Sequence, residues 1–183
     1  MSRIAVLALV LLASIAHAQD HDDAYFGHSY QGDVFNDGPR QKAYLMGKTG
    51  NVRFPITTKS PEAQKFFEQG VGQLHGFWYF EAERSFRQVA LLDPDCAMAY
   101  WGMAMANHEN EKRAAGFIKK ARTLLVNTTP RERLYLDSLS DLHLGSGDKR
   151  KRQQNVLDAF KKISADYPDD IEAKAFYVVR AWQ

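Results

Sequence analysis

The sequence has a single cysteine, Cys96, and its formal net charge is only +2. One cysteine cannot form an intrachain disulfide, and it also excludes the Cys-x-x-Cys-His motif that attaches haem. Because Cys96 opens an apolar helical pattern, we expect its thiol to be buried rather than reactive. The near-neutral charge argues against a nucleic-acid-binding protein, which would carry a clear excess of Lys and Arg on one face.

The sequence also lacks an apolar run long enough to span a bilayer. The apolar stretch Ile4–Ile15 is too short for that. It follows Arg3 and precedes Ala16-His17-Ala18, and this order is typical of a cleaved secretory signal peptide. We therefore predict a signal peptide at residues 1–18 and an exported protein, periplasmic or extracellular, that does not span the membrane after cleavage. The alternative of an uncleaved anchor helix is disfavoured by the polar residues that follow at once. No cysteine stands directly after the apolar stretch, which excludes lipid anchoring through a cysteine at the cleavage site.

Cleavage after Ala18 would leave a mature chain that begins Gln19-Asp20-His21. A free amine with histidine in the third position can bind Cu(II) or Ni(II) through the amine, two backbone amides and the imidazole. His21 is therefore a candidate metal ligand, with a simple polar tail as the favoured alternative. We expect no other metal site and no cofactor.

The usual catalytic motifs are absent or incomplete. His108-Glu109 begins like a zinc-protease motif, but Lys112 stands where the second histidine is needed. Gly47-Lys48-Thr49 resembles the end of a phosphate-binding loop, but Lys42 replaces its first glycine. The chain has neither a G-x-S-x-G motif nor an EF-hand loop. We therefore predict that it is not an enzyme.

Three histidines, His75, His108 and His143, fall at the expected ends of helices in different hairpins. They could meet at a metal ion along one edge, but ordinary capping or packing is the favoured interpretation. The basic run Lys149–Arg152 is expected to be a solvated helix face, with docking to an acidic partner as the alternative.

What the sequence does contain is a succession of apolar residues with helical period. Ser60-Pro61 is a typical helix start, and Thr129-Pro130-Arg131-Glu132 is a capping box. Asp95 is expected to cap the helix that follows it. The predicted helices span 61 to about 75, 79 to 92, a stretch from 97, about 110 to 126, a stretch from 130, a stretch ending before 167, and a stretch from about 171.

Prolines punctuate this pattern at Pro94, Pro130 and Pro168, with separations of 36 and 38 residues. Such a period indicates stacked helix hairpins, because one hairpin cannot bury its apolar face alone. We predict an all-α fold: an α-solenoid of about three hairpins plus a final helix, preceded by an irregular segment at 19–59. The helical domain is placed at 60–183, with repeats at about 61–95, 96–129 and 130–168 and the start of a fourth at 170–183.

The repeats resemble the tetratricopeptide repeat. The first matches the family pattern best, and the second and third match it in part. The run FPITTKSPEAQKFFEQG, together with FWYFEAERSFRQVALLDPDCAMAYWGMAMA after it, also resembles a group of secreted bacterial proteins with this repeat. The positions that carry the resemblance are Phe66, Gly70, Tyr79, Glu81, Ala82, Phe86 and Pro94, then Ala97, Ala99, Tyr100 and Ala104, then Phe160 and Pro168.

In that family the first helix of each hairpin lines a concave groove. The resemblance therefore implies a partner-binding groove at Gln64, Phe67, Val71, Met98, Trp101, Met105 and His108. This lining would accept an apolar or helical peptide. The alternative is that these side chains are core, or are covered by the 19–59 segment, whose expected anchors are Tyr25, Phe26, Phe35, Leu45 and Phe54.

The predicted function is an exported repeat scaffold that binds a protein or peptide in the cell envelope, without nucleic acid as a partner. One alternative is the accessory portion of a larger secreted enzyme or redox protein. The other is a copper-binding envelope protein that uses its N-terminal histidines. The helical pattern continues to Trp182 without a polar capping helix, which favours a fragment of a longer chain over an edge that meets another subunit.

Overall fold

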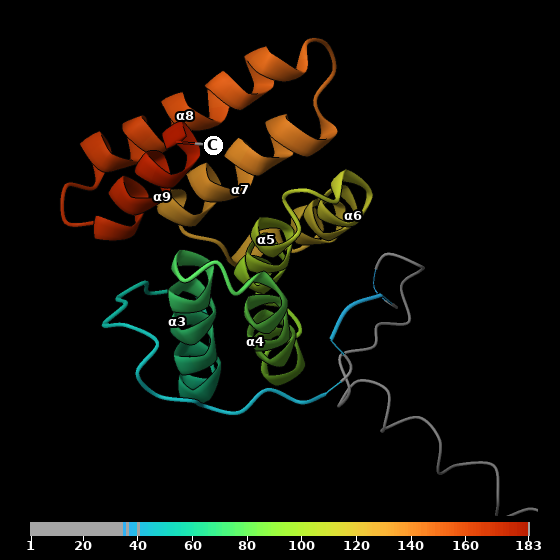
Figure 1. The fold of residues 1–183 in the computed structure, drawn as a ribbon, viewed down its shortest axis with the longest axis vertical. Helices are drawn as coiled ribbons and strands as arrows, with labels where there is room; N and C mark the ends of the chain where they lie inside the picture. The colour runs from blue at the N-terminus through green and yellow to red at the C-terminus, as the bar shows by residue number, and fades with distance from the viewer. Residues whose placement is uncertain (1–34, 36, 40, 183) are drawn as a thin grey trace, which may run out of the picture.

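The computed structural model describes residues 35, 37–39 and 41–182 (Figure 1). This part of the chain is helical and contains no strand, so the predicted all-α class is confirmed for it. The predicted signal peptide, the candidate ligand His21 and the expected anchors Tyr25 and Phe26 lie outside the described residues.

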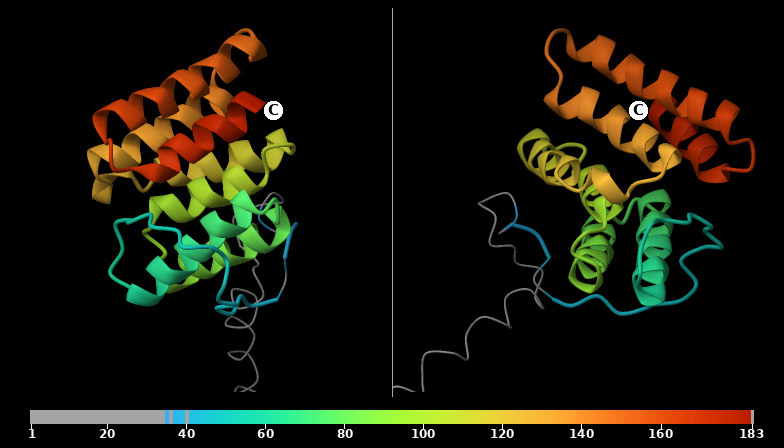
Figure 2. Two further views of the ribbon diagram at one scale, coloured as in Figure 1. Left: turned by 60° about the vertical axis from the view of Figure 1, so that its left-hand side comes forward. Right: turned by 180° about the vertical axis from the view of Figure 1, so that it is seen from behind.

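The helices follow one another in hairpins joined by short turns. Each helix contacts the next, and the first helices of successive hairpins also touch, α3 with α5 and α5 with α7. Figures 1 and 2 show the hairpins lying one after another from α3 to α9. The elements are α3 (Pro61–His75), α4 (Tyr79–Leu92), α5 (Ala97–Ala106), α6 (Glu111–Arg122), the 3-10 turn η1 (Leu125–Asn127), α7 (Pro130–Leu144), α8 (Lys149–Asp166) and α9 (Ile171–Trp182).

The predicted helix starts are confirmed where a polar side chain caps them. The Ala63 N–H donates to Ser60 Oγ over 3.1 Å, and Thr129 and Glu132 form the reciprocal capping box. The expected cap at Asp95 is wrong, because α5 begins directly after Cys96 and no side chain caps it. Helix α6 is also shorter than predicted, since the chain tightens into η1 after Arg122 instead of continuing to 126.

Helices α3 and α5 both come close to the ring of Phe86 on α4. A Cβ added at Gly70 of α3 would lie 2.7 Å from this ring, and one added at Gly102 of α5 would lie 2.4 Å from it. Both distances are too short for a real contact. The two glycines therefore let α3 and α5 close on Phe86.

The irregular segment before α3 packs against the helices through Phe35 and Phe54, as expected. Leu45, the third expected anchor in the described part, is instead exposed. The segment between Val52 and Ile56 forms no strand, and its backbone groups bond to helix side chains rather than to another chain segment.

Buried charges hold the start of this segment in place. Arg87 pairs with Glu83 (Nη2 to Oε1, 2.7 Å), and Arg113 pairs with the same carboxylate. The guanidinium of Arg87 also donates to the backbone oxygens of Phe35 (2.9 Å) and Asp37 (2.7 Å). We call the irregular segment before α3 the lead-in. Because each buried charge has an opposite partner, this network ties the lead-in to α4 and α6 without an unpaired carboxylate.

Cys96 is 2 % exposed, and burial raises the pKa of its thiol to about 12. The thiol is therefore protonated and packed at neutral pH, which confirms the expected structural role.

Candidate functional site

The groove implied by the family resemblance is filled in this structure. Five of its seven residues have almost no exposed surface: Phe67, Val71, Met98, Trp101 and Met105. Gln64 and His108 are partly exposed. The expectation of an open groove is therefore corrected: these side chains form part of a closed core, as the alternative interpretation held. Their role in binding a partner stays a prediction.

Phe54 is the residue that closes this core. Its ring centroid lies 5.1 Å from that of Phe67, 5.8 Å from that of Trp101 and 5.0 Å from that of Tyr135. The guanidinium carbon of Arg131 lies 4.2 Å from the centre of the Phe54 ring. The lead-in thus supplies the side chain that an entering peptide would otherwise place between α3, α5 and α7.

Polar contacts hold Phe54 in this position. The Gln64 amide donates to the Phe54 carbonyl (2.8 Å) and accepts from the Ile56 N–H (3.0 Å). The N–H and hydroxyl of Thr57 donate to the two oxygens of Glu132, over 2.6 and 2.7 Å. Gln64 and Glu132 therefore act as clamps for the lead-in, and sequence reasoning missed this role because the bonded positions lie up to 75 residues apart.

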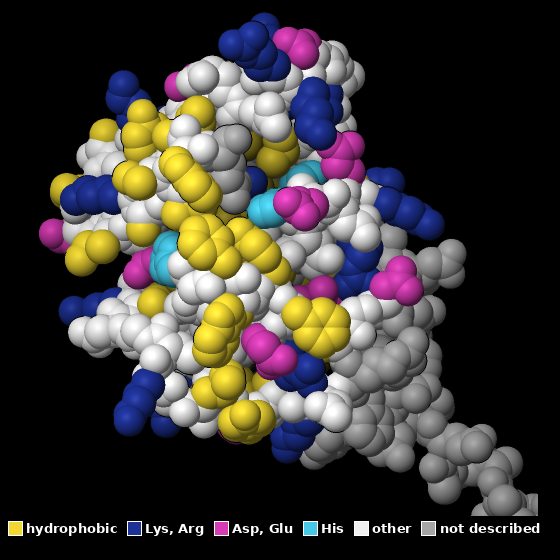
Figure 3. Space-filling view, in the orientation of Figure 1, with side chains coloured by type: hydrophobic (Ala, Val, Ile, Leu, Met, Phe, Trp, Pro, Cys, Tyr) yellow, Lys and Arg dark blue, Asp and Glu magenta, His cyan; other side chains and the backbone are white. Residues whose placement is uncertain are grey.

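The largest exposed aromatic feature lies elsewhere, at the turn between α3 and α4. We call it the turn aromatic surface and define it by Phe77, Trp78, Phe80 and Trp182, all of which are exposed. The ring centroid of Phe77 lies 6.4 Å from that of Trp182 at the end of α9. Figure 3 shows hydrophobic side chains gathered on this face of the molecule, over the α3–α4 hairpin and α9.

A pocket of about 480 Å³ adjoins the turn aromatic surface. Trp78 forms one wall, and Met46, Gly72 and Gly76 line the rest together with the chain from Gly47 to Thr49. A Cβ at Gly72 would lie 2.0 Å from the Thr49 carbonyl oxygen, so the loop and α3 come together only because this residue is glycine.

Phe77 has an unusual backbone conformation. Helix α3 ends in a Schellman motif, in which the Trp78 N–H donates to the Gln73 carbonyl and the Phe77 N–H donates to the Leu74 carbonyl. The left-handed position of this motif normally holds glycine, but here Phe77 occupies it with φ 59°. A bulky residue in this conformation costs on the order of 1–2 kcal/mol relative to glycine.

A sequence signal for this surface was present and was not used. Residues 77–80 read Phe-Trp-Tyr-Phe, four aromatic side chains in succession. Neither a helix nor a turn can direct four consecutive side chains toward one core, so some had to face solvent.

Comparison with known proteins adds no family to these observations: no protein-family model, curated protein or solved structure matches the chain. Over residues 35, 37–39 and 41–182, no helix combines the length and apolar character needed to cross a bilayer. The same residues include no group of three or more His, Cys, Asp or Glu side chains placed to hold a metal ion.

Proposed function

We propose that this chain is an exported α-solenoid of the tetratricopeptide type that binds a protein or peptide partner through the turn aromatic surface, without catalysis of its own. The repeating hairpins, the contacts between their first helices and the proline spacing support the solenoid. The residue order at positions 1–18 supports export.

The observation that carries the binding proposal is Phe77. Its side chain is 52 % exposed, and its backbone is held in a left-handed conformation that glycine would adopt at lower cost. Neither burial nor backbone preference accounts for a phenylalanine there. Backbone strain of this kind concentrates at functional positions, and large exposed aromatic residues are the side chains that most often anchor a partner.

The partner that fits this surface is a peptide segment with apolar side chains. The exposed rings of Phe77 and Trp182, whose centroids lie 6.4 Å apart, offer an apolar contact, and the pocket of about 480 Å³ that Trp78 lines is large enough for one inserted side chain.

A photo-crosslinking residue at position 78 tests the proposal in envelope extract, with the same residue at position 126 as the control. Val126 is also exposed but lies on η1, away from the turn. We expect a discrete crosslinked species from position 78 that is missing from position 126. The purified crosslinked partner should then bind the unmodified protein with a measurable Kd.

The Phe77→Gly variant separates binding from folding. Glycine removes the left-handed strain, so the free energy of unfolding should stay within about 1 kcal/mol of the parent value, while partner affinity should fall at least about tenfold. Trp78→Ala should weaken binding similarly, and Val126→Ala should leave it unchanged. Unchanged affinity in both Phe77→Gly and Trp78→Ala, or identical crosslinking from positions 78 and 126, would refute the proposal.

The other functions that the sequence raised, an accessory portion of a larger secreted enzyme or redox protein and an N-terminal copper site, stay predictions, because no described residue bears on them.

A further inference from the structure

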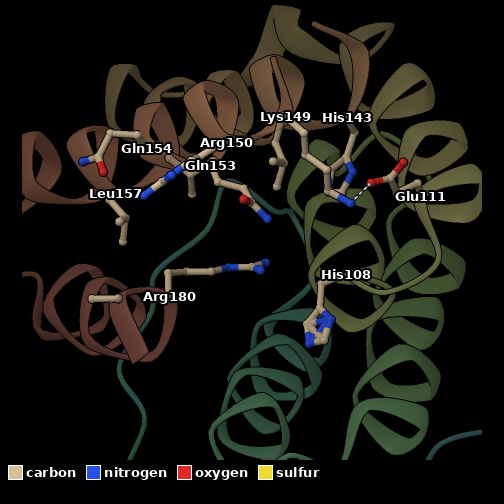
Figure 4. Close-up of a pocket in the computed structure, with 12 residues that line it drawn as sticks. His108, Glu111, His143, Lys149, Arg150, Gln153, Gln154, Leu157 and Arg180 are labelled. Carbon is tan, nitrogen blue, oxygen red and sulfur yellow. Dashed lines mark ion pairs between the residues drawn. The ribbon is translucent and has the colours of Figure 1, made fainter. Parts of the chain in front are cut away.

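A second pocket, of about 490 Å³, opens at the other side of α9, and none of Phe77, Trp78 and Phe80 lines it. Side chains from the α5–α6 turn, the start of α6, the end of α7, the first half of α8 and the end of α9 all reach it. Figure 4 shows Arg180 extending from α9 into the space below α8, with His108 and His143 on the opposite wall.

The charged groups in this pocket are mostly positive. Lys149, Arg150 and Arg180 line it, and Glu111 is the one acidic residue in the lining. Glu111 is already paired with Lys149, whose Nζ lies 2.5 Å from its carboxylate oxygen. Arg150 and Arg180 add two further positive charges to the lining, Arg180 Nη2 donates to Met105 Sδ over 3.5 Å, and burial lowers the pKa of Arg180.

Two histidines contribute ring nitrogen atoms that bond none of the described residues. The Nε2 atoms of His108 and His143 are buried and have no hydrogen-bond partner among the described residues. Burial, followed by the charge of Arg180, lowers the pKa of His143 to about 4 and lowers that of His108 as well. Both rings are thus neutral at pH 7, and a neutral imidazole can donate one hydrogen bond from Nε2.

The remaining lining is partly apolar. Leu142, Val156 and Leu157 form one wall, and the amides of Gln153 and Gln154 stand beside them. This volume is several times that of a simple inorganic ion and falls in the usual range for small-molecule sites. A ligand that satisfies the whole pocket therefore needs both an anionic group and a carbon skeleton.

We propose that this pocket binds a small organic anion, a carboxylate or a phosphate ester, whose charged group pairs with Arg180 and accepts hydrogen bonds from His108 and His143. The planar guanidinium donates two parallel hydrogen bonds to either kind of anion. Arg150 adds charge at the mouth, and the apolar wall contacts the carbon skeleton. This site is independent of the proposed peptide-binding surface.

Calorimetric titration at pH 7 and constant ionic strength tests the proposal with four probes. Glutarate and glycerol 3-phosphate represent the two anion classes, inorganic phosphate represents a simple ion, and putrescine is a cation of similar length. We expect saturable binding of glutarate or glycerol 3-phosphate with a Kd on the order of 1 mM or tighter, and none for putrescine. Binding of inorganic phosphate alone, equal binding of putrescine, or no saturation by about 10 mM of either organic anion would overturn it.

Substitutions locate the site. Arg180→Met keeps the length of the side chain and removes its charge, and should weaken organic-anion binding at least about tenfold. Arg122→Met, the same exchange at an exposed position on α6 outside the pocket, is the matched control and should have no effect. If Arg180→Met does not fold, Arg150→Met takes its place. Undiminished binding after loss of the pocket arginine, or an equal loss in Arg122→Met, would contradict the site.

A spectroscopic readout separates ligand contact from a structural role. In the unmodified protein, the imidazole resonances of His143 should shift on saturation with the organic anion, while those of His75 should not. His75 bonds Glu172 (Nε2 to Oε2, 2.5 Å) and does not line the pocket. Equal shifts, or none at His143, would also count against the proposal.

Discussion

Replacement of Phe54 with alanine tests whether the lead-in segment is a structural part of the helical core. The ring is fully buried and lies among Phe67, Trp101 and Tyr135. Truncation of a buried phenylalanine costs about 3–5 kcal/mol through lost transfer free energy and the cavity that remains. Three aromatic contacts and the guanidinium of Arg131 at 4.2 Å favour the upper half of this range.

Equilibrium unfolding in urea measures this loss. Leu45→Ala is the matched control, because Leu45 belongs to the same segment but is exposed, and its truncation should change the free energy of unfolding by less than about 0.5 kcal/mol. Hydrogen exchange supplies a local readout, since the Thr57 amide donates to Glu132 over 2.6 Å. In Phe54→Ala this amide should exchange faster than in the parent protein.

The reasoning would be wrong if Phe54→Ala cost less than about 1 kcal/mol and left exchange at Thr57 unchanged. That result would mean that the helices bury their own apolar faces and that the lead-in adds little. A small loss of unfolding free energy together with fast exchange at Thr57 would instead show that the segment detaches as a unit. The loss would then be limited to the free energy with which the segment docks, and the segment would not be a structural part of the core.

Two further perturbations probe the helical part. Gly102→Ala places a methyl group 2.4 Å from the Phe86 ring and should destabilise the protein by about 1–3 kcal/mol in urea unfolding. In a Phe86→Leu background the same substitution should cost less. Equal costs in both backgrounds would argue against this contact. His143 has a folded-state pKa of about 4, below the ordinary value of 6.5, so the unfolded chain binds a proton that the folded chain does not. The stability that His143 contributes should be complete above pH 6.5 and decline as the pH falls toward 4. His143→Phe should flatten this part of the profile of stability against pH, measured by thermal unfolding. An unchanged slope would contradict the lowered pKa of His143.

Much of the fold was predictable because its signals are local. Ser60 and the Thr129–Glu132 box start helices through bonds that span three residues, and the positions of α3, α4 and α9 follow from such signals and from the apolar period. The errors are local as well. Asp95 is a residue type that often caps helices, but its side chain does not cap α5. After α6 the chain tightens into a 3-10 turn, and no residue type in the sequence marks that change.

The candidate sites were less predictable, because they depend on contacts between distant parts of the chain. His108 was expected in a groove with Trp101, and a meeting of His75, His108 and His143 along one edge was the less favoured alternative to capping or packing. In the structure His108 and His143 line one pocket with Arg180, which comes from a third hairpin, and His75 does not line it. The turn aromatic surface had a signal in the Phe-Trp-Tyr-Phe run, but only the left-handed backbone of Phe77 distinguishes it from ordinary packing.

The sequence by itself determined the helices and their order, because a helix is closed by hydrogen bonds four residues apart and its apolar period is written along the same stretch. Only the tertiary structure decided what covers the apolar faces. Phe54 reaches Trp101 and Tyr135 across 47 and 81 positions of the chain. A buried face accepts any apolar side chain of suitable shape, and which one arrives depends on the path of the whole chain.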